Sequence, residues 1–368
     1  MEKKSIVIKV GTNTLTDENG LLDRAYLHEL IDQIAELKSM GYAVVLVTSG
    51  AIAAGIEKLG LTKRPEDIRT LQATAAIGQV SLIDAYATEL AKHDMLSAQI
   101  LLTRHDTGDR HTYLHARDTL ERLLELGVVP IINENDTVAI EEIAFGDNDT
   151  LAALVATIID ATLVLLLTDV DGLYTSNPRK DSAAQRIEHV SNISKEILDM
   201  ASGVGSSLGS GGMVTKLRAA RVLLASGIPM VLCHGRDTHV VVEAVKGSAK
   251  GTYFEPESSC SLNQKKRWIA LGNAIQGTIV IDAGAVRALQ RGGNSLLSAG
   301  ITGVGGDFEA ESPVSVLDEN GMVIARGMCA YSSKEVLQIV GKHTDEALAL
   351  VPQRHGVPVI HCDDMAVL

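Results

Sequence analysis

Aromatic side chains are scarce in this chain: Phe, Trp and Tyr together make up 3% of its 368 residues. A hydrophobic core has to be built mainly from Ala, Val, Ile and Leu, which is typical of α/β folds with a parallel sheet. Apolar residues of all kinds reach 46%. The chain can therefore bury a large core, which excludes a disordered protein, and its length is typical of about two domains.

Long hydrophobic runs are also missing. No segment offers the ~18 consecutive apolar residues that a membrane-spanning helix needs. The N-terminal sequence MEKKSIVIKVG leads directly into a strand pattern and lacks the cleavage site of a signal peptide. The four cysteines show no metal-ligand spacing such as CxxC. We therefore expect a cytoplasmic protein with reduced thiols, no membrane contact and no metal site of its own.

An excess of basic charge is absent as well, because the formal net charge is −13. This balance argues against a protein held mainly by the phosphates of a nucleic acid. Residues 265–342 hold 8 basic and 7 acidic side chains, so they form no basic stripe either.

Strand-like and helix-like patterns alternate over the first 250 residues. The strand-like runs are continuously apolar, which is typical of strands buried on both faces. We predict strands at 5–10, 43–48, 97–103, 128–134, 162–170 and 229–235, and helices at 23–39 and 68–91. The expected fold class is α/β, a three-layer αβα sandwich with a mainly parallel central sheet. Residues 137–145 alternate and predict a small hairpin near a sheet edge, with an irregular loop as the alternative.

The pattern changes after about residue 250. Short strand-like pieces at 277–282, 313–318 and 322–331 predict a small β-rich second domain. The expected boundaries are a first domain at 1–254, a linker at 255–274, a second domain at 275–352 and a C-terminal tail at 353–368.

The first motif that can carry chemistry is Lys9-Val10-Gly11-Thr12, at the end of the first strand. Ligands of open α/β sheets bind outside the carboxyl ends of the strands. A lysine there can hold an anion, and the N–H of a following glycine can approach the same anion closely. The alternative is a lysine that simply faces solvent at a strand end.

The second motif is the glycine-rich segment 202–216, which leads into a helix predicted from Met213 with Lys216 in its first turn. Free N–H groups and the helix dipole make such a helix start an anion site. It is not a Walker A loop, because GxxxxGK[ST] does not occur in the chain. The alternative is a disordered Gly/Ser loop.

The third motif places Asp147, Asn148 and Asp149 before an apolar helix. Helix capping needs one such residue, or two, so a third indicates contact with a ligand or a cation, and capping alone is the alternative. Asp136, in Asn133-Glu134-Asn135-Asp136, adds a carboxylate at a strand end.

Two weaker motifs, Thr48-Ser49-Gly50-Ala51 and Thr168-Asp169-Val170-Asp171, also follow predicted strands. The first could hold a carboxylate and the second could border a nucleotide. His111 and His115 are interpreted as an ordinary helix face, and the run from His361 to Asp364 is too short to indicate a metal site.

Taken in order, these motifs resemble the amino-acid kinase family. LLTDVDGLYTSNP and GSGGMVTKLRAA resemble its shared nucleotide-binding half, and IVIKVGTNTL, VTSGAIAAG, INENDTV and FGDNDTLAALVA resemble its glutamate 5-kinase branch. GTIVIDAGAVRAL, GNSLLSAGITGVGGDF and ARGMCAYSS resemble a PUA domain. The resemblance covers nearly all of the chain. Ser210 stands where family members often have threonine, which keeps the hydroxyl.

The resemblance implies an enzyme that uses ATP, with Mg²⁺ carried by the nucleotide, to phosphorylate the side-chain carboxylate of glutamate, the first step of proline biosynthesis. It implies catalytic roles for Lys9, Gly11, Asp149 and Lys216, and glutamate binding by Ser49, Asp136, Asp147 and Asn148. It further implies nucleotide binding by Lys9, Thr168, Asp169, Ser210, Gly211, Gly212, Met213, Val214, Thr215 and Lys216.

Alternatives remain open at this point. The substrate could be aspartate, N-acetylglutamate or a nucleotide, as in other branches of the family, and PUA domains of RNA-modifying enzymes contact RNA, although the charge balance makes RNA binding the weaker interpretation. The resemblance also implies inhibition by proline and a homo-oligomer, either a dimer or a tetramer. The small-residue helix at 73–79 could pack against a partner subunit or simply against the sheet.

Overall fold

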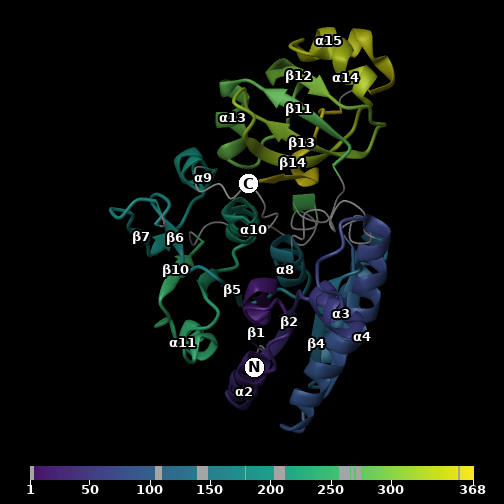
Figure 1. Ribbon diagram of the computed structural model, residues 1–368. Coiled ribbons are helices and arrows are strands. Elements are labelled where there is room, and N and C mark those ends of the chain that lie inside the picture. The colour runs from purple at the N-terminus through teal and green to yellow at the C-terminus, as the bar shows by residue number, and fades with distance from the viewer. Residues whose placement is uncertain are drawn as a thin grey trace. The chain divides into compact units, whose positions relative to one another are not determined.

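The structure is a computed structural model of the chain. It describes residues 4–103, 110–138, 148–178, 180–202, 212–256, 266, 269–270, 275–354 and 357–368. The chain forms two compact units (Figure 1). Unit 1 comprises Met1–Thr103 and Leu114–Ser259, and unit 2 comprises Arg104–Tyr113 and Cys260–Leu368. Each unit has a hydrophobic core of its own.

Unit 1 is built on an eight-stranded sheet with the strand order β3-β4-β2-β1-β5-β9-β10-β8. The strands are β1 (Ser5–Val10), β2 (Ala43–Val47), β3 (Ser97–Leu102), β4 (Val129–Glu134), β5 (Leu163–Thr168), β8 (His189–Val190), β9 (Met230–His234) and β10 (Gly251–Phe254). Neighbouring strands run parallel except β10, which is antiparallel to β9. The predicted, mainly parallel sheet is therefore confirmed. All six residues of β1 are buried, as expected for a central strand covered on both faces.

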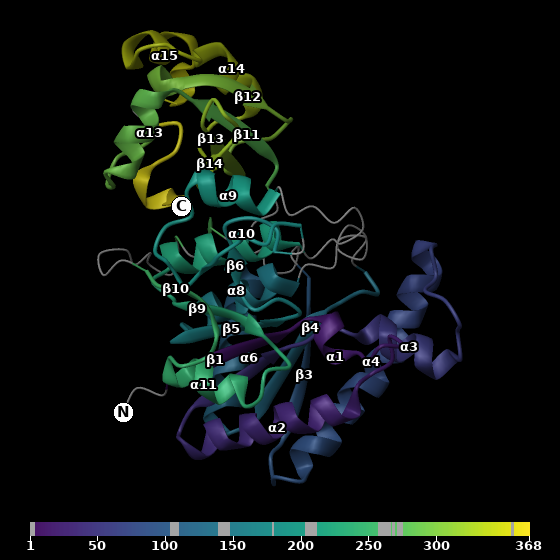
Figure 2. The same cartoon turned by 60° about the vertical axis from the view of Figure 1, so that its left-hand side comes forward.

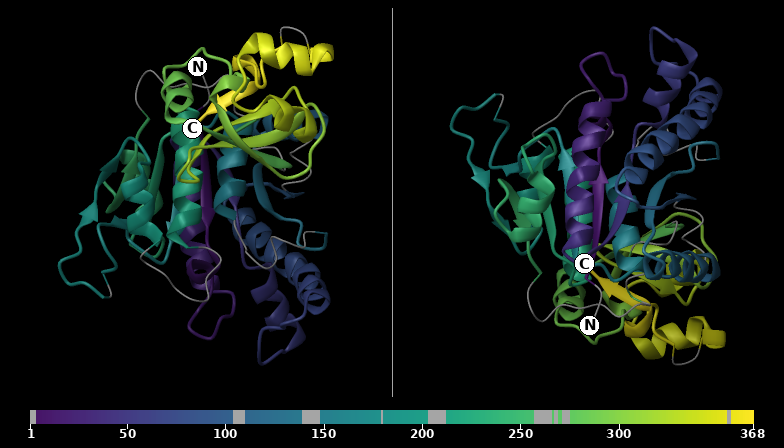
Figure 3. Two further views of the ribbon diagram at one scale, coloured as in Figure 1. Left: turned by 90° about the horizontal axis from the view of Figure 1, so that it is seen from above. Right: turned by 90° about the horizontal axis from the view of Figure 1, so that it is seen from below.

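Helices cover both faces of this sheet (Figures 2 and 3). α2 (Arg24–Ser39), α4 (Ile68–Ala91) and α11 (Val240–Lys246) share a core with one face. α8 (Asn148–Ile158) and α10 (Met213–Ala225) pack against each other and against strands from the other face. The three-layer prediction is thus confirmed. Shorter elements of unit 1 are α1 (Thr12–Leu15), α3 (Ala51–Leu59), β6 (Leu173–Tyr174), β7 (Arg186–Ile187) and α9 (Lys195–Ser202), while α6 (Arg110–Glu125) begins among residues grouped with unit 2.

The small-residue segment of α4 packs against α3 inside unit 1. A Cβ on Gly78 would overlap the backbone carbonyl of Ala51 in α3, and a Cβ on Gly55 would overlap the carbonyl of Thr74 in α4. The two helices can therefore approach this closely only because both positions are glycine. The contact fixes α4 beside the residues that follow β2.

Unit 2 contains a five-stranded sheet with the order β12-β11-β13-β14-β15. Its elements are β11 (Gly277–Ile281), α13 (Ala283–Gln290), β12 (Ile301–Gly305), β13 (Ser312–Leu317), β14 (Val323–Cys329), α14 (Ser333–Ile339), α15 (Thr344–Leu350) and β15 (Met365–Val367). The three strands predicted here are confirmed. The separate tail predicted from residue 353 is wrong, because β15 pairs antiparallel with β14 and Met365 and Ala366 are buried.

Several predictions fall outside the described residues: most of the hairpin at 137–145, most of the linker at 255–274, and the site residues Asp147, Ser210 and Gly211. Among the described helices, none combines the length and the apolar character that crossing a membrane requires.

Candidate active site

Predicted site residues from four strands gather at one edge of the sheet of unit 1, in the part of the chain that the structure describes. The central strands β4, β2, β1 and β5 are parallel neighbours, so their carboxyl ends meet there. These ends carry Lys9 on β1, Ser49 after β2, Asp136 after β4 and Thr168 on β5. Residues spread over about 160 positions of the sequence are thus brought to a common edge, which is where open α/β sheets bind ligands.

Asp149 holds two lysines at this edge. Its Oδ1 lies 2.6 Å from Nζ of Lys9, and its Oδ2 lies 3.0 Å from Nζ of Lys216. The lysine side chains are 8% and 7% exposed and the aspartate side chain is 2% exposed. Two ammonium groups and one carboxylate leave a net charge of +1 in a buried position, which favours an anionic ligand.

The charge state of Asp149 follows from its surroundings. Burial alone would raise the pKa of its carboxyl group, but the ammonium groups of Lys9 and Lys216 outweigh burial and hold that pKa well below its ordinary value. Asp149 is therefore ionised at neutral pH. It is already bonded on both oxygens, so it serves to orient the two lysines rather than to accept a proton.

Lys216 reaches this position because α10 begins beside α8. Gly212 is the N-cap of α10, and Lys216 occupies the first turn. The hydroxyl of Thr215 donates to Oδ2 of Asp149 at 2.9 Å, which gives the carboxylate a further bond from the same helix. As the first residues of the helix, Met213 and Val214 have N–H groups with no intrahelical acceptor, so they add to an anion-binding helix start.

Gly11 differs from its prediction in one respect. Its N–H donates to the carbonyl oxygen of Leu167 on β5 at 3.2 Å, so it extends the sheet and is not available to a phosphate in this conformation. The catalytic role predicted for Gly11 stays a prediction. A Cβ on Gly11 would lie 3.7 Å from Nζ of Lys9, so the glycine does leave the space in front of the ammonium group open.

Asn148 belongs to a second, uncharged network. It is 7% exposed, and its Nδ2 lies 2.7 Å from the carbonyl oxygen of Thr48, 3.0 Å from Oγ of Ser49 and 3.0 Å from Oδ1 of Asn133. Asn148 and the half-buried Ser49, two predicted substrate residues, are thus in direct contact. Asp136 lies in the turn after β4, the neighbour of β2, and is half-buried.

This network includes residues that the sequence analysis did not assign. Asn133 is 2% exposed and donates from Nδ2 to Oε1 of Gln79 at 2.8 Å. The hydroxyl of Thr48 lies 2.8 Å from that of the fully buried Tyr86. Asn133 stood in the recognised motif at the end of β4, but no local pattern marks Gln79 or Tyr86, because their partners are distant in sequence.

A hollow of about 230 Å³ lies after β5, next to the start of α10. Its lining includes Asp169, Gly172, Tyr174, Met213 and His234, which come from the turn after β5, from β6, from α10 and from β9. This is the segment predicted to border a nucleotide, and that role stays a prediction. The pKa of Asp169 lies below its ordinary value: partial desolvation would raise it, but hydrogen bonds, led by that of the Asn13 amide, outweigh this effect.

Asp171 holds the outer wall of this hollow. The hydroxyl of Tyr174 donates to its Oδ1 at 2.9 Å, and Nζ of Lys250 lies 2.7 Å from its Oδ2. Gly172 has a φ of +142°, and a Cβ there would lie 2.7 Å from Oγ1 of Thr252. The turn after β5 therefore requires glycine to bring the wall this close to β10.

Arg236 is a further residue that the sequence analysis missed. Its guanidinium donates to the carbonyl oxygens of Thr14 and Thr16 at 3.0 and 2.7 Å, and to Oδ2 of Asp23 at 2.7 Å. It also stacks on the ring of Tyr26. The arginine thus ties α1, which follows Lys9 and Gly11, to the start of α2.

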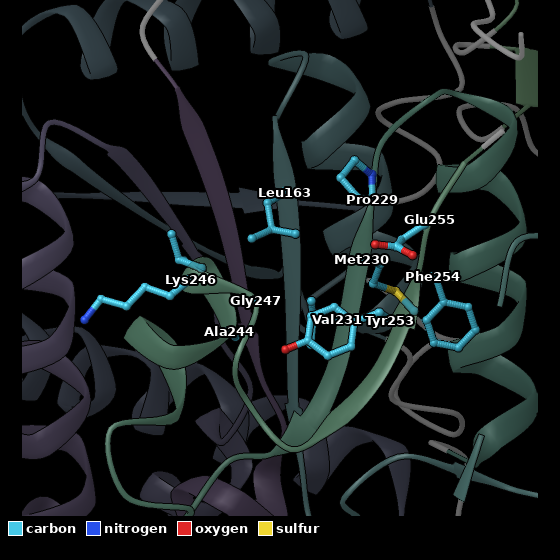
Figure 4. A pocket seen from close by; sticks show the side chains of 11 residues that line it. Leu163, Pro229, Met230, Val231, Ala244, Lys246, Gly247, Tyr253, Phe254 and Glu255 are labelled. Carbon is cyan, nitrogen blue, oxygen red and sulfur yellow. The ribbon is translucent and has the colours of Figure 1, made fainter. Parts of the chain in front are cut away.

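A second hollow lies at the opposite end of the strands (Figure 4). It is lined by Leu163 at the start of β5, Pro229 before β9, and Tyr253, Phe254 and Glu255. Because the amino ends of parallel strands face it, it lies on the wrong side of the sheet for the chemistry described above.

A group of possible metal ligands is present in unit 2. Atoms of His361, Cys362 and Asp363 lie within 4.8 Å of one another. Nδ1 of His361 accepts a hydrogen bond from the backbone N–H of Asp363, so the imidazole already serves as a local cap. Nothing else in the described residues around it indicates an ion.

Two family models match the chain. The model of the Amino acid kinase family matches residues 4–234, more than half of the chain, and the model of the PUA domain matches residues 277–350. The first segment falls in unit 1 apart from residues 104–113, and the second falls in unit 2.

Full-length relatives are similar to the chain as a whole. A protein of Desulfitobacterium hafniense (strain Y51) named Glutamate 5-kinase is 44% identical over 366 residues, which cover 99% of this chain and 98% of that protein. A protein of Vibrio vulnificus (strain YJ016) with the same name is 44% identical over 367 residues, which cover 100% of this chain and 97% of that protein.

Among solved structures, the carbamate kinase from Giardia lamblia bound to AMP-PNP is similar in fold. It is 17% identical, covers 70% of this chain and 99% of its own, and superposes with a TM-score of 0.51. At this identity the likeness concerns the fold alone.

Proposed function

The chain belongs to the amino acid kinase family, and we propose that it transfers the γ-phosphoryl group of ATP to the side-chain carboxylate of free L-glutamate. The products are L-glutamyl 5-phosphate and ADP, as in the first step of proline biosynthesis. The full-length relatives named Glutamate 5-kinase support this choice of substrate, because both units of the chain align with them. The buried ammonium groups of Lys9 and Lys216 at the sheet edge support phosphoryl transfer as the type of reaction.

The chemistry needs charge neutralisation and positioning, and no proton acceptor. A glutamate side chain has an ordinary pKa of about 4.3, so the attacking carboxylate is already ionised at neutral pH. As its oxygen attacks the γ-phosphorus, the bond from that phosphorus to the bridging oxygen of ADP breaks. Lys9 faces the substrate side and Lys216 the nucleotide side, and both stabilise the negative charge on the moving phosphoryl group. Asp149 keeps them in place.

Glutamate would bind beside the lysines on the neutral network. Ser49 and Asn148 offer hydrogen bonds, and Asp136 offers a carboxylate for the substrate ammonium group. Since Nδ2 of Asn148 is directed at three protein acceptors, its Oδ1 is the atom left to accept from that ammonium. We keep Asp147 as a proposed neighbour of this site.

The nucleotide would lie over α10, with Thr168 and Asp169 along its border and its phosphates at the N–H groups that start the helix. Ser210, Gly211 and Gly212 complete this proposed set. The described carboxylates of the site have protein partners: Asp149 holds two lysines, and Asp169 accepts from Asn13 and Thr168. These residues fit a Mg²⁺ ion carried by the phosphates, where it would neutralise their charge, better than one in a protein cage.

The observation that carries the proposal is the pair of buried ammonium groups on Asp149 beside an uncharged amide network. The test is an incubation with ATP, Mg²⁺ and hydroxylamine, which traps an acyl phosphate as its hydroxamate. We expect a hydroxamate from glutamate and little from aspartate or N-acetylglutamate under the same conditions. A chain that forms ADP with another acid but no hydroxamate from glutamate would refute the choice of substrate.

We also propose a cytoplasmic enzyme, inhibited by proline, that works as a dimer or tetramer. Reduced thiols support the choice of compartment, because Cys233 and Cys329 are free and buried. Light scattering and an ADP-release assay with and without proline test the other two points. We assign no RNA binding to unit 2, given its balanced charge.

A further inference from the structure

Gln79 is a buried polar residue in the middle of α4 that the proposed mechanism does not use. It is 8% exposed, and its Oε1 accepts a hydrogen bond from Nδ2 of Asn133 at 2.8 Å. Its own Nε2 is buried and has no hydrogen-bond partner in the part of the chain that the structure describes. A buried donor without a partner destabilises a fold, so packing alone would favour an apolar side chain here. The feature that requires glutamine is therefore the acceptor Oε1.

That acceptor decides how the amide of Asn133 is oriented. With Nδ2 of Asn133 directed at Gln79, its Oδ1 accepts from the N–H of Glu134 at 2.9 Å and from Nδ2 of Asn148 at 3.0 Å. If the amide of Asn133 were flipped, its NH₂ group would face these two donors. Gln79 thus removes the flipped state by offering an acceptor on the correct side.

The orientation of Asn133 in turn affects Asn148. Oδ1 of Asn133 is one of the three acceptors around Nδ2 of Asn148, together with Ser49 and the carbonyl of Thr48. These bonds direct the NH₂ group of Asn148 into the protein. Its carbonyl oxygen is then the atom that a bound amino acid can use.

We infer that Gln79 is a positioning residue for the amino-acid substrate. It fixes the amide of Asn133, and through Asn133 it keeps Asn148 ready to accept a hydrogen bond from the substrate ammonium group. The inference rests on the proposed function. Among the described residues, Gln79 bonds to Asn133 and not to Lys9, Asp149 or Lys216, so its effect is confined to the amino-acid side.

The position of Gln79 is set by rigid packing. The preceding residue, Gly78, lies against the backbone of Ala51 and Gly55 in α3. Since α3 follows Ser49 directly, the same helix contact fixes both ends of the network, Gln79 on one side and Ser49 on the other. A positioning role needs such a rigid support.

The test compares three full-length variants in the trapping assay. Gln79→Met keeps the length of the side chain and removes the acceptor. We expect it to raise the KM for glutamate by roughly 10-fold, with kcat and the KM for ATP changed less than about threefold. Gln79→Glu keeps an acceptor oxygen toward Asn133 and should restore much of the affinity for glutamate. Thr74→Val is the matched control, because Thr74 is also buried on α4 and its hydroxyl also has no described partner; it should behave like the wild type.

The possible results distinguish a failure of the proposed function from a failure of the inference about Gln79. A wild-type enzyme that forms no glutamyl hydroxamate refutes the proposed function itself. With an active wild type, an unchanged KM for glutamate in Gln79→Met overturns the inference. So does a variant in which kcat and both KM values worsen together with the melting temperature, because that pattern indicates a structural role only. If Gln79→Met does not fold, Gln79→Ala removes the same acceptor without placing a new side chain in the core.

Discussion

Asn148 and Asp149 are consecutive residues in the first turn of α8, yet they belong to two chemically different halves of the site. Asp149 contacts two ammonium groups, whereas the amide of Asn148 contacts a hydroxyl, a carbonyl and another amide. In the proposed function, the charged half would face the phosphoryl group, on which negative charge moves during the reaction. The neutral half would face the amino acid, whose reacting carboxylate needs orientation but no proton transfer.

One helix start can therefore serve two substrates in the proposed reaction. Ion pairs between buried groups are strong but depend on protonation, while a network of amides and hydroxyls keeps its orientation over a wide pH range. Variants on the charged side should therefore change kcat and the pH dependence of stability. Variants on the neutral side should change the KM for glutamate.

The largest effect is expected for Asp149→Asn. This change leaves the ammonium groups of Lys9 and Lys216 buried without their carboxylate, which should lower the free energy of unfolding by roughly 3–5 kcal/mol at pH 7 and abolish most activity. Urea unfolding followed by circular dichroism measures the first effect and the trapping assay measures the second.

The same variant tests the pKa of Asp149. Because the folded state lowers this pKa, the carboxylate contributes stability that is fully present above the ordinary aspartate pKa of ~3.9 and is lost as the pH falls toward the lower folded value. The stability gap between wild type and Asp149→Asn should thus be constant from neutral pH to about pH 5 and shrink below about pH 4. A gap that grows on acidification would contradict the assignment.

Next in size is Lys216→Ala. Loss of one preorganised charge at the phosphoryl group should lower kcat by about 100- to 1,000-fold, with a smaller change in the KM for glutamate. Steady-state rates with both substrates varied measure this. Lys246→Ala, at the hollow on the opposite end of the strands, is the control and should keep wild-type rates. Near-normal turnover of folded Lys216→Ala would remove the central role of that lysine.

On the neutral side, Asn148→Ala should raise the KM for glutamate by about 10- to 100-fold, since a hydrogen bond to a charged ammonium group is lost. The KM for ATP should change little. Asn13→Ala provides the opposite case. Asn13 bonds to Asp169, which lines the hollow after β5, so its loss should change the KM for ATP. If both variants changed the same constant, the division into two halves would be wrong.

The two halves also differ in how well the sequence predicts them. Lys9, Asp149 and Lys216 each lie where a strand ends or a helix begins, and such positions are marked by local patterns of glycine, polar caps and apolar runs. A parallel sheet then brings strand ends together. Gln79 lies mid-helix among small residues that indicate packing, and its partner Asn133 is 54 positions away, so only the fold reveals the contact.

Short pairings are equally hard to predict. β15 has three residues, too few to show the alternation of apolar and polar side chains that marks a strand. It joins the sheet only because the backbone of β14 can pair with it at the sheet edge. The N–H of Gly11 bonds to Leu167 of β5, so the hydrogen bonding between the strands extends one residue beyond β1. The composition of the sequence does not indicate where such strand pairing ends. In both cases the deciding interaction is a backbone hydrogen bond to a distant segment.

The smallest effect is expected for Thr215→Val, which removes a neutral donor from the charged half. Its hydroxyl donates to Oδ2 of Asp149 at 2.9 Å, but Lys216 bonds to the same oxygen, so the carboxylate stays paired. We expect a loss of about 1 kcal/mol in stability and a decrease in kcat of roughly fivefold, with the KM for glutamate unchanged. Thermal unfolding and steady-state kinetics measure these values. A rise in the KM for glutamate instead would show that the charged half reaches into amino-acid binding, and the boundary between Asn148 and Asp149 would have to be redrawn.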